Sequence, residues 1–135
     1  QMIHRFALLE PESKFNQLLS SAAGWYMLPD SSITFPYGTQ TTPIQGISLE
    51  SAFKKDVYVI IGLEDTDPNS FNLRHTPEAD AQGLNRLDRA EYFYTKSLDI
   101  AIDQGLDFNW SFSSAANVGH DGGQMANFAL NLVYD

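Results

Sequence analysis

The chain has 135 residues, which fits one domain of ordinary size, and 43% of them are apolar, enough for a hydrophobic core. Seventeen acidic against eight basic residues give a formal charge of −9, which excludes most binding to nucleic acids and to anionic membrane surfaces. The lack of cysteine excludes disulfides, thiolate metal sites and a cysteine nucleophile. The longest apolar run, at residues 57–63, is too short for a transmembrane helix.

The first residues predict a helix, because Met2, Phe6 and Leu9 fall at helical spacing. No capping residue and no signal peptide are visible at this end, so we expect the helix to begin before Gln1, in a longer protein. Translation starting at Met2 is the alternative. These features assign no cellular compartment. After Pro11, residues 15–23 predict a buried strand that ends at Gly24.

Residues 24–46 show neither helical nor strand periodicity. A segment of this length without regular structure is typical of a lid or a binding loop. Its aromatic residues indicate that it packs down on the domain; they include Trp25, Tyr26, Phe35 and Tyr37. We therefore expect a lid-like loop over 24–46.

The second half alternates strands and helices. Residues 57–62 predict a strand buried on both faces of a parallel sheet, since they are β-branched, aromatic and apolar. Thr76 followed by Pro77 predicts a helix start. Residues 87–104 predict a long helix that ends at Gly105; its apolar positions are Leu87, Ala90, Tyr94, Leu98, Ala101 and Ile102.

Two more elements follow. Phe108, Trp110 and Phe112 alternate with polar residues, as in a strand. Asp121, with Gln124 three residues later, predicts the capping box of a last helix. The whole order predicts one α/β domain over residues 1–135, with three layers and a mostly parallel sheet between flanking helices. One sheet edge, beside residues 15–23, should stay open.

Candidate functional residues follow the strands. Ligands bind beyond the carboxyl ends of parallel strands, and there the chain places Asp65 and Asp67 after one strand and His120 after the next. A carboxylate that fixes the tautomer of a histidine makes a general base. A histidine bonded only to backbone at a helix start is the alternative for His120. Arg86 and Arg89, at the start of the long helix, are expected to pair with Glu78, Asp80 or Asp88.

Four segments carry a resemblance to a known family: residues 22–29 (AAGWYMLP), 61–68 (IGLEDTDP), 74–79 (RHTPEA) and 118–125 (VGHDGGQM). In this order the chain resembles the carboxyl-terminal half of α/β-hydrolase esterases of the poly(3-hydroxybutyrate) depolymerase-like kind. The resemblance implies Asp65 as the catalytic acid, with Asp67 as second choice, and His120 as the catalytic base. It also implies that Trp25 and Tyr26 belong to the lid or the substrate pocket.

The chain departs from that family at the nucleophile. No Gly-x-Ser-x-Gly elbow occurs in it; the nearest segment, Gly46 to Glu50, lacks the second glycine and a preceding strand. The resemblance implies that the serine lies shortly upstream of Gln1, together with the oxyanion-hole amides. Because triad members act as a unit, these residues alone should not form an efficient esterase.

The expected function is therefore a serine hydrolase acting on small carboxylic esters, without cofactor or metal, seen here as its acid and histidine half. The alternative is a non-catalytic binding or assembly domain, which forms a homodimer or pairs with the missing amino-terminal half through the open edge. Weaker alternatives are a calcium loop at 65–76, zinc bound by His4, His75 and His120, phosphate at 119–123 and an aromatic carbohydrate platform.

Overall fold

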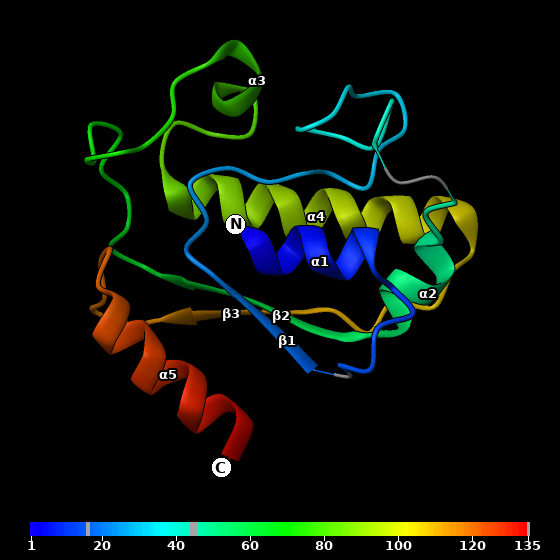
Figure 1. The fold of residues 1–135 in the computed structure, drawn as a ribbon. Helices are drawn as coiled ribbons and strands as arrows, with labels where there is room; N and C mark the ends of the chain where they lie inside the picture. The colour runs from blue at the N-terminus through cyan, green and yellow to red at the C-terminus, as the bar shows by residue number, and fades with distance from the viewer. Residues whose placement is uncertain (16, 44–45, 135) are drawn as a thin grey trace.

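The computed structural model describes residues 1–15, 17–43 and 46–134. Its elements, shown in Figure 1, are α1 (Met2–Leu9), β1 (Gln17–Ser21), α2 (Leu49–Lys54), β2 (Asp56–Gly62), α3 (Pro77–Asp80), α4 (Arg86–Gln104), β3 (Ser111–Ala115) and α5 (Gly122–Tyr134). In this part of the chain, the strands form one parallel sheet in the order β1-β2-β3. The predicted α/β class is confirmed.

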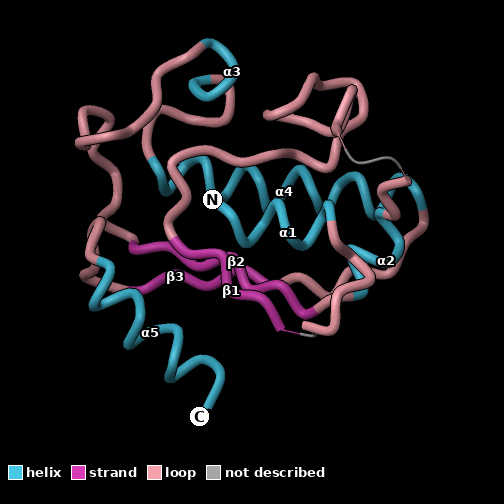
Figure 2. Tube along the Cα trace, viewed as in Figure 1, coloured by secondary structure: helices cyan, strands magenta, loops and turns pink. Residues whose placement is uncertain are grey.

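The helices cover the sheet in two unequal layers. Helices α1 and α4 lie on one face and α5 lies on the other, so that the sheet is the middle layer (Figure 2). The carboxyl ends of the parallel strands lie at the same end of the sheet, and the loops to α3 and α5 leave from this end (Figure 1). Among the described residues, no helix is long and apolar enough to cross a membrane.

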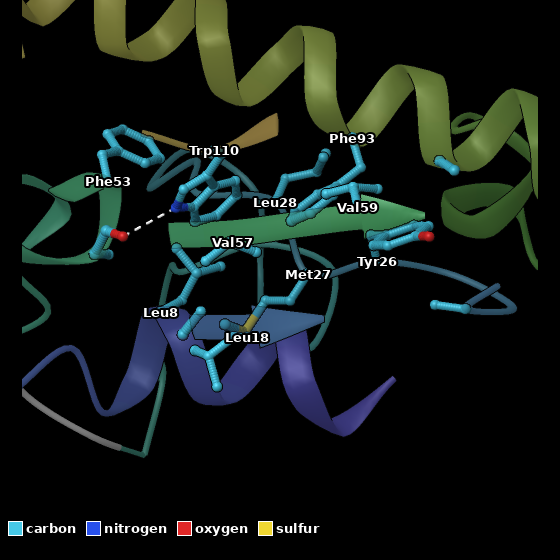
Figure 3. Close-up of a cluster of buried hydrophobic side chains, with 14 of the residues drawn as sticks. Leu8, Leu18, Tyr26, Met27, Leu28, Phe53, Val57, Val59, Phe93 and Trp110 are labelled. Carbon is cyan, nitrogen blue, oxygen red and sulfur yellow. Dashed lines mark hydrogen bonds between the residues drawn. The ribbon is translucent and has the colours of Figure 1, made fainter. Parts of the chain in front are cut away.

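The main core lies between the sheet and the α1 and α4 layer. Tyr26 stacks on Phe93 with ring centroids 4.5 Å apart, and Phe93 lies 5.6 Å from Trp110 (Figure 3). The Trp110 indole donates a hydrogen bond of 2.9 Å to the carbonyl of Ala52, which satisfies its only polar atom. A smaller cluster under α5 contains Ile60, Ala115 and Met125.

Two strands are shorter than their patterns predicted. Within the expected 15–23 stretch, β1 spans Gln17–Ser21, its burial alternates, and Phe15 is 63% exposed; Asn16 lies outside the described residues. Strand β3 begins only at Ser111. The residues before it turn toward α2 instead, since the amide of Asn109 donates to the carbonyl of Phe53 at 2.8 Å.

The long helix has the predicted bounds within a residue, and Gly105 ends it in the left-handed conformation at φ 65°. Of its predicted apolar positions, Ala90 and Ala101 are buried, and Leu87 and Tyr94 pack against the core. Phe93 and Ser97 are buried, whereas Ile102 is 66% exposed. Likewise, α1 buries His4, Ala7 and Leu8, and Met2 is exposed. Most of the predicted apolar positions therefore face the core, and Met2 and Ile102 are the exposed exceptions.

The segment 24–46, which was expected to be a lid-like loop, begins in the main core. Among its described residues there is no helix or strand, as predicted, and 44–45 lie outside the description. Yet its first residues, Tyr26 to Leu28, are buried in the main core. Helix α2 follows it and was not predicted. Ser48 is the serine of the segment that most nearly matches a nucleophile elbow in sequence. It caps α2, and its hydroxyl accepts from the amide of Ser51 at 3.2 Å.

Candidate active site

Asp65 lies in a tight turn after β2 and is fixed by its backbone. Its amide donates to the carbonyl of Gly62 at 3.1 Å, and its own carbonyl accepts from the amide of Leu87 at 3.2 Å. The second bond ties the turn to the beginning of α4. Asp65 is 3% exposed. The carboxylate is therefore held in a defined position away from bulk water.

His120 lies in the turn between β3 and α5, and this turn is bonded to the Asp65 turn. The amide of Leu63 donates to the carbonyl of Ala115 at 2.9 Å, and the amide of Glu64 donates to the carbonyl of Val118 at 2.9 Å. Any side chain at Gly62 would collide with the carbonyl of Val118. The close approach of the two turns therefore requires glycine at position 62.

The two turns bring His120 and Asp65 into direct contact, with Nδ1 of the ring 2.9 Å from Oδ2 of the carboxylate. An ionised carboxylate only accepts hydrogen bonds, so Nδ1 carries the proton and Nε2 presents a lone pair. The His120 side chain is 48% exposed, and within the described residues Nε2 has no hydrogen-bond partner. The pair has the geometry of an oriented general base.

Arg86 holds the other oxygen of the carboxylate. Its Nη1 lies 3.6 Å from Oδ1 of Asp65, and both side chains are buried. The guanidinium also donates to the hydroxyl of Ser70 at 2.6 Å and to the carbonyl of Phe71 at 3.1 Å. The expected partners of Arg86 were Glu78, Asp80 or Asp88, and this prediction is wrong for Arg86. The reason is that α4 begins beside the Asp65 turn, a tertiary contact that spacing does not encode.

The neighbouring charged residues make contacts that stabilise the loops and helix ends around the site. Arg89 pairs with Asp80 at 2.9 Å, as predicted. Asp67 is exposed and accepts from the amide of Asn69 at 2.8 Å, so it shapes the loop, and Asp65 is the carboxylate that contacts His120. Asp121 caps α5 by accepting from the amide of Gln124 at 2.8 Å. A full capping box would also have the Gln124 side chain accept from the amide of Asp121. That amide donates to the carbonyl of Gly119 instead.

Trp25 and Tyr26 come directly after the Gly24 that follows β1. Tyr26 is fully buried, and the side chain of Gln82 bonds both its amide and its carbonyl at 2.8 Å. Burial raises the pKa of Tyr26. Trp25 is 6% exposed and packs against the ring of Tyr37 at 4.7 Å. Both side chains are therefore buried, and of the two only Tyr26 belongs to the main core cluster.

The histidines lie in separate environments. His4 is buried in the core, where its Nε2 accepts from the amide of Met27 at 3.0 Å and burial lowers its pKa well below the usual value. His75 contacts Asp80 at 2.8 Å. Among the described residues, no three metal-binding side chains converge on one point. Zinc bound jointly by His4, His75 and His120 is therefore inconsistent with this arrangement.

A cavity adjoins His120 on the α5 side of the sheet. Its volume is about 410 Å³, and its lining is mostly apolar, with Leu19, Ala22 and Ile60 from the sheet side and Met125 and Ala129 from α5. A larger cavity, about 870 Å³, is lined by residues within 29–42 and 46–50 and by the end of α4, and it contains none of the predicted site residues. The cavity beside His120 is therefore the one relevant to the candidate site.

No protein-family model and no curated protein matches the chain. Two solved structures are similar: poly(aspartic acid) hydrolase-1 from Sphingomonas sp. KT-1, with a TM-score of 0.91 and 32% identity, and the poly(3-hydroxybutyrate) depolymerase LpqC from Bordetella parapertussis, with a TM-score of 0.88 and 27% identity. This chain resembles the carboxyl-terminal half of an α/β-hydrolase.

The two alignments each include 98% of this chain, and they cover 50% and 45% of the solved structures. The chain thus spans about half the length of these proteins. Both proteins are hydrolases, which supports the prediction of a hydrolase.

Proposed function

We propose that this chain supplies the acid and the general base of a serine hydrolase that cleaves carboxylic esters. The observation that carries the proposal is the 2.9 Å contact between Asp65 and Nδ1 of His120, which leaves Nε2 of the ring free beside a cavity. The serine lies outside the 135 residues, because the Gly-x-Ser-x-Gly elbow is absent from them.

The chemistry follows from the tautomer. Nε2 of His120 takes the proton of the serine hydroxyl as its oxygen attacks the ester carbonyl, and the imidazolium then returns this proton to the departing alcohol. Water repeats the sequence on the acyl-enzyme, releasing the acid and restoring the serine. Asp65 stabilises the imidazolium, and Arg86 keeps the carboxylate in place through its second oxygen. The apolar cavity beside His120 is proposed to hold part of the substrate.

The ester substrate is the finer part of the proposal. One similar structure is a depolymerase of poly(3-hydroxybutyrate), which is a polyester, and the other is a hydrolase of poly(aspartic acid). Ester and amide hydrolysis use the same serine, histidine and acid, and the leaving group is what distinguishes them. We therefore propose an ester, the more reactive carbonyl, as the first substrate to test.

One observation favours a second function, that of a non-catalytic assembly domain. Within the described residues, β1 pairs only with β2, which leaves the backbone groups along its other edge unpaired. Such an edge invites pairing with another strand. Under this alternative the edge binds a second copy of the chain or the remaining half of a larger protein, and the contact between Asp65 and His120 is structural.

The deciding experiment uses the natural gene product that contains these residues. It is treated with a fluorophosphonate ester, and its intact mass is measured. We expect one phosphonyl adduct on a serine outside this chain, and we expect labelling to become much slower in a His120→Ala variant. His75→Ala is the control, since His75 contacts Asp80 and not Asp65.

Two results would contradict the proposed function. One is a natural product that takes up no adduct, and the other is equal labelling of His120→Ala and the wild type. Either result would favour the assembly domain. Its oligomeric state, measured by light scattering, would then decide between the two kinds of partner for β1.

A further inference from the structure

His75 lies between two oxygen atoms that only accept hydrogen bonds. Its Nδ1 is 2.8 Å from Oδ1 of Asp80, and its Nε2 is 2.8 Å from the carbonyl oxygen of Pro68. Neutral imidazole carries one N–H, whereas imidazolium carries two. Both contacts are therefore hydrogen bonds only when the ring of His75 is protonated.

Asp80 cannot supply the missing proton, because it is already paired with an arginine. The same Oδ1 that faces His75 accepts from Nη2 of Arg89 at 2.9 Å. This ion pair requires the carboxylate form of Asp80, which has no proton to donate. When the ring of His75 is neutral, one of its nitrogen lone pairs must face an oxygen, and one of the two contacts becomes repulsive.

The two contacts of His75 close a loop at its base. The contact with Pro68 joins the ends of residues 68–75, which we call the latch loop, and the contact with Asp80 attaches this base to α3. A loop whose ends are held together in this way can open and close as a unit. His75 is the residue whose side chain makes both of these connections.

The middle of the latch loop is held independently of His75. Arg86 donates to the hydroxyl of Ser70 at 2.6 Å and to the carbonyl of Phe71 at 3.1 Å. The amide of Leu73 donates to the carbonyl of Ser70 at 3.0 Å, and the Leu73 side chain is buried. Opening the base therefore loosens the loop without detaching it from the domain.

Two arginines near His75 oppose its protonation. Arg89 shares the Asp80 oxygen with His75, and its Nη1 also donates to the carbonyl of Arg74 at 2.9 Å. Arg74 directly precedes His75 in the chain. Its guanidinium carbon lies 5.0 Å from the ring centre of Trp25, and that of Arg5 lies 4.2 Å from the same ring. The positive charge of His75 thus depends on Asp80 for its stabilisation.

The ring of His75 is accessible to protons from solvent. Its side chain is 44% exposed, and that of Asp80 is 36% exposed. Glu78, on the same helix as Asp80, is also exposed, but among the described residues it makes no hydrogen bond or ion pair with His75. Histidine is the side chain that ordinarily changes charge between about pH 5 and pH 8.

We propose that His75 is a protonation-dependent latch of the loop 68–75. The imidazolium form ties Pro68 to Asp80 and keeps the base of the loop closed, and loss of one ring proton releases one contact and loosens the loop. This inference does not rest on the proposed function. Asp65 keeps its bonds to Gly62 and Leu87 in both forms of the latch.

The first test reads the protons on the ring directly. The natural full-length protein is labelled with ¹⁵N in its histidine rings, and the His75 signals are identified by their loss in His75→Gln. At about pH 5.5 both ring nitrogens should give the signal of a protonated nitrogen, and one should lose its proton as the pH is raised to about 8.5. A ring that carries a single N–H throughout this range would overturn the inference.

The second test measures amide hydrogen exchange of residues 68–75 in the same protein. Exchange times are corrected for the intrinsic effect of pH. We expect corrected exchange of this segment to be about 3- to 10-fold faster at about pH 8.5 than at about pH 5.5, the effect of losing one partly exposed charged hydrogen bond. Exchange of α4 should not change, which distinguishes loop opening from unfolding of the domain.

Two variants test the two sides of the latch. His75→Gln has one donor and one acceptor, as neutral histidine has, so its loop should exchange at both pH values as the wild type does at the higher one. In Asp80→Asn, the amide can donate to neutral Nδ1 of His75 while its oxygen still accepts from Arg89. Its loop should therefore stay slow at about pH 8.5. Glu78→Gln is the matched control, which removes an equal charge from α3 and should keep the wild-type difference.

Three exchange results would overturn the inference. They are equal corrected exchange of the wild type at the two pH values, a wild-type difference in His75→Gln, and loss of the difference in Glu78→Gln. The second result would assign the effect to another group, such as the part-exposed His120. If α4 also exchanges faster in Asp80→Asn, that variant has lost its fold, and His75→Gln decides.

Discussion

The two faces of the sheet differ in how much they bury. On the face covered by α1 and α4, sixteen of the described residues form one buried cluster, whereas the α5 face has three. The candidate site spans this boundary. Asp65 is tied to the well-packed side through Arg86 and the amide of Leu87, while His120 sits in the turn that leads into α5. The difference indicates that stability is concentrated on one face and the reacting nitrogen lies toward the other.

The largest expected effect separates activity from stability at this boundary. In the full-length protein, His120→Ala and Asp65→Asn should each reduce kcat for an ester by about 10⁴-fold, because the base or its correct tautomer is lost. His120→Ala should leave unfolding by urea within about 0.5 kcal/mol of the wild type, since an exposed side chain contributes little. Normal turnover in either variant would contradict the assignment of both residues.

The second prediction compares the faces directly. Phe93→Ala should lower the free energy of unfolding by about 3–5 kcal/mol, because Phe93 is fully buried between Tyr26 and Trp110. Met125→Ala should cost about 2 kcal/mol, because the smaller cluster beside a cavity loses fewer contacts. Urea unfolding followed by circular dichroism measures both. Equal losses would mean that the two faces contribute alike.

The third prediction concerns the join between the two turns. Gly62→Ala should destabilise the protein by about 1–3 kcal/mol, because the added methyl group meets the carbonyl of Val118. Separating the turns also moves His120 from Asp65, so kcat should fall by more than the loss of folded protein explains. Gly122→Ala is the matched control for stability, since a methyl group there meets no other atom. Retained activity in Gly62→Ala would show that the turns tolerate separation.

The smallest effect is expected at the cap of α5. Asp121→Ala should lower stability by about 1 kcal/mol, since the Gln124 amide loses its acceptor. Asp121→Asn keeps an acceptor and should recover most of this loss. Thermal unfolding of the three proteins distinguishes them. If Asp121→Ala instead abolished turnover while stability stayed normal, Asp121 would have a role in the reaction rather than at the helix end.

Much of the fold could be predicted because its signals are local. The β-branched run of β2, the Thr76 and Asp121 caps and the Gly105 stop each act within a few residues. The missed helix α2 is short, and the segment before β3 alternates like a strand although it packs on α2. Periodicity alone does not show which element a segment packs against. The contact between α2 and the segment before β3 therefore could not be predicted from the sequence pattern.

The candidate site, too, could be predicted from the sequence only in part. The sequence by itself determined that a carboxylate and a histidine follow successive strands, because parallel strands end at one edge of a sheet. Only the tertiary structure decided that Asp65 and not Asp67 meets His120, that Arg86 joins this carboxylate, and that Arg5 and Arg74 share Trp25. These contacts join residues far apart in the chain, and their distances depend on how helices and loops pack against the sheet, which no local pattern encodes.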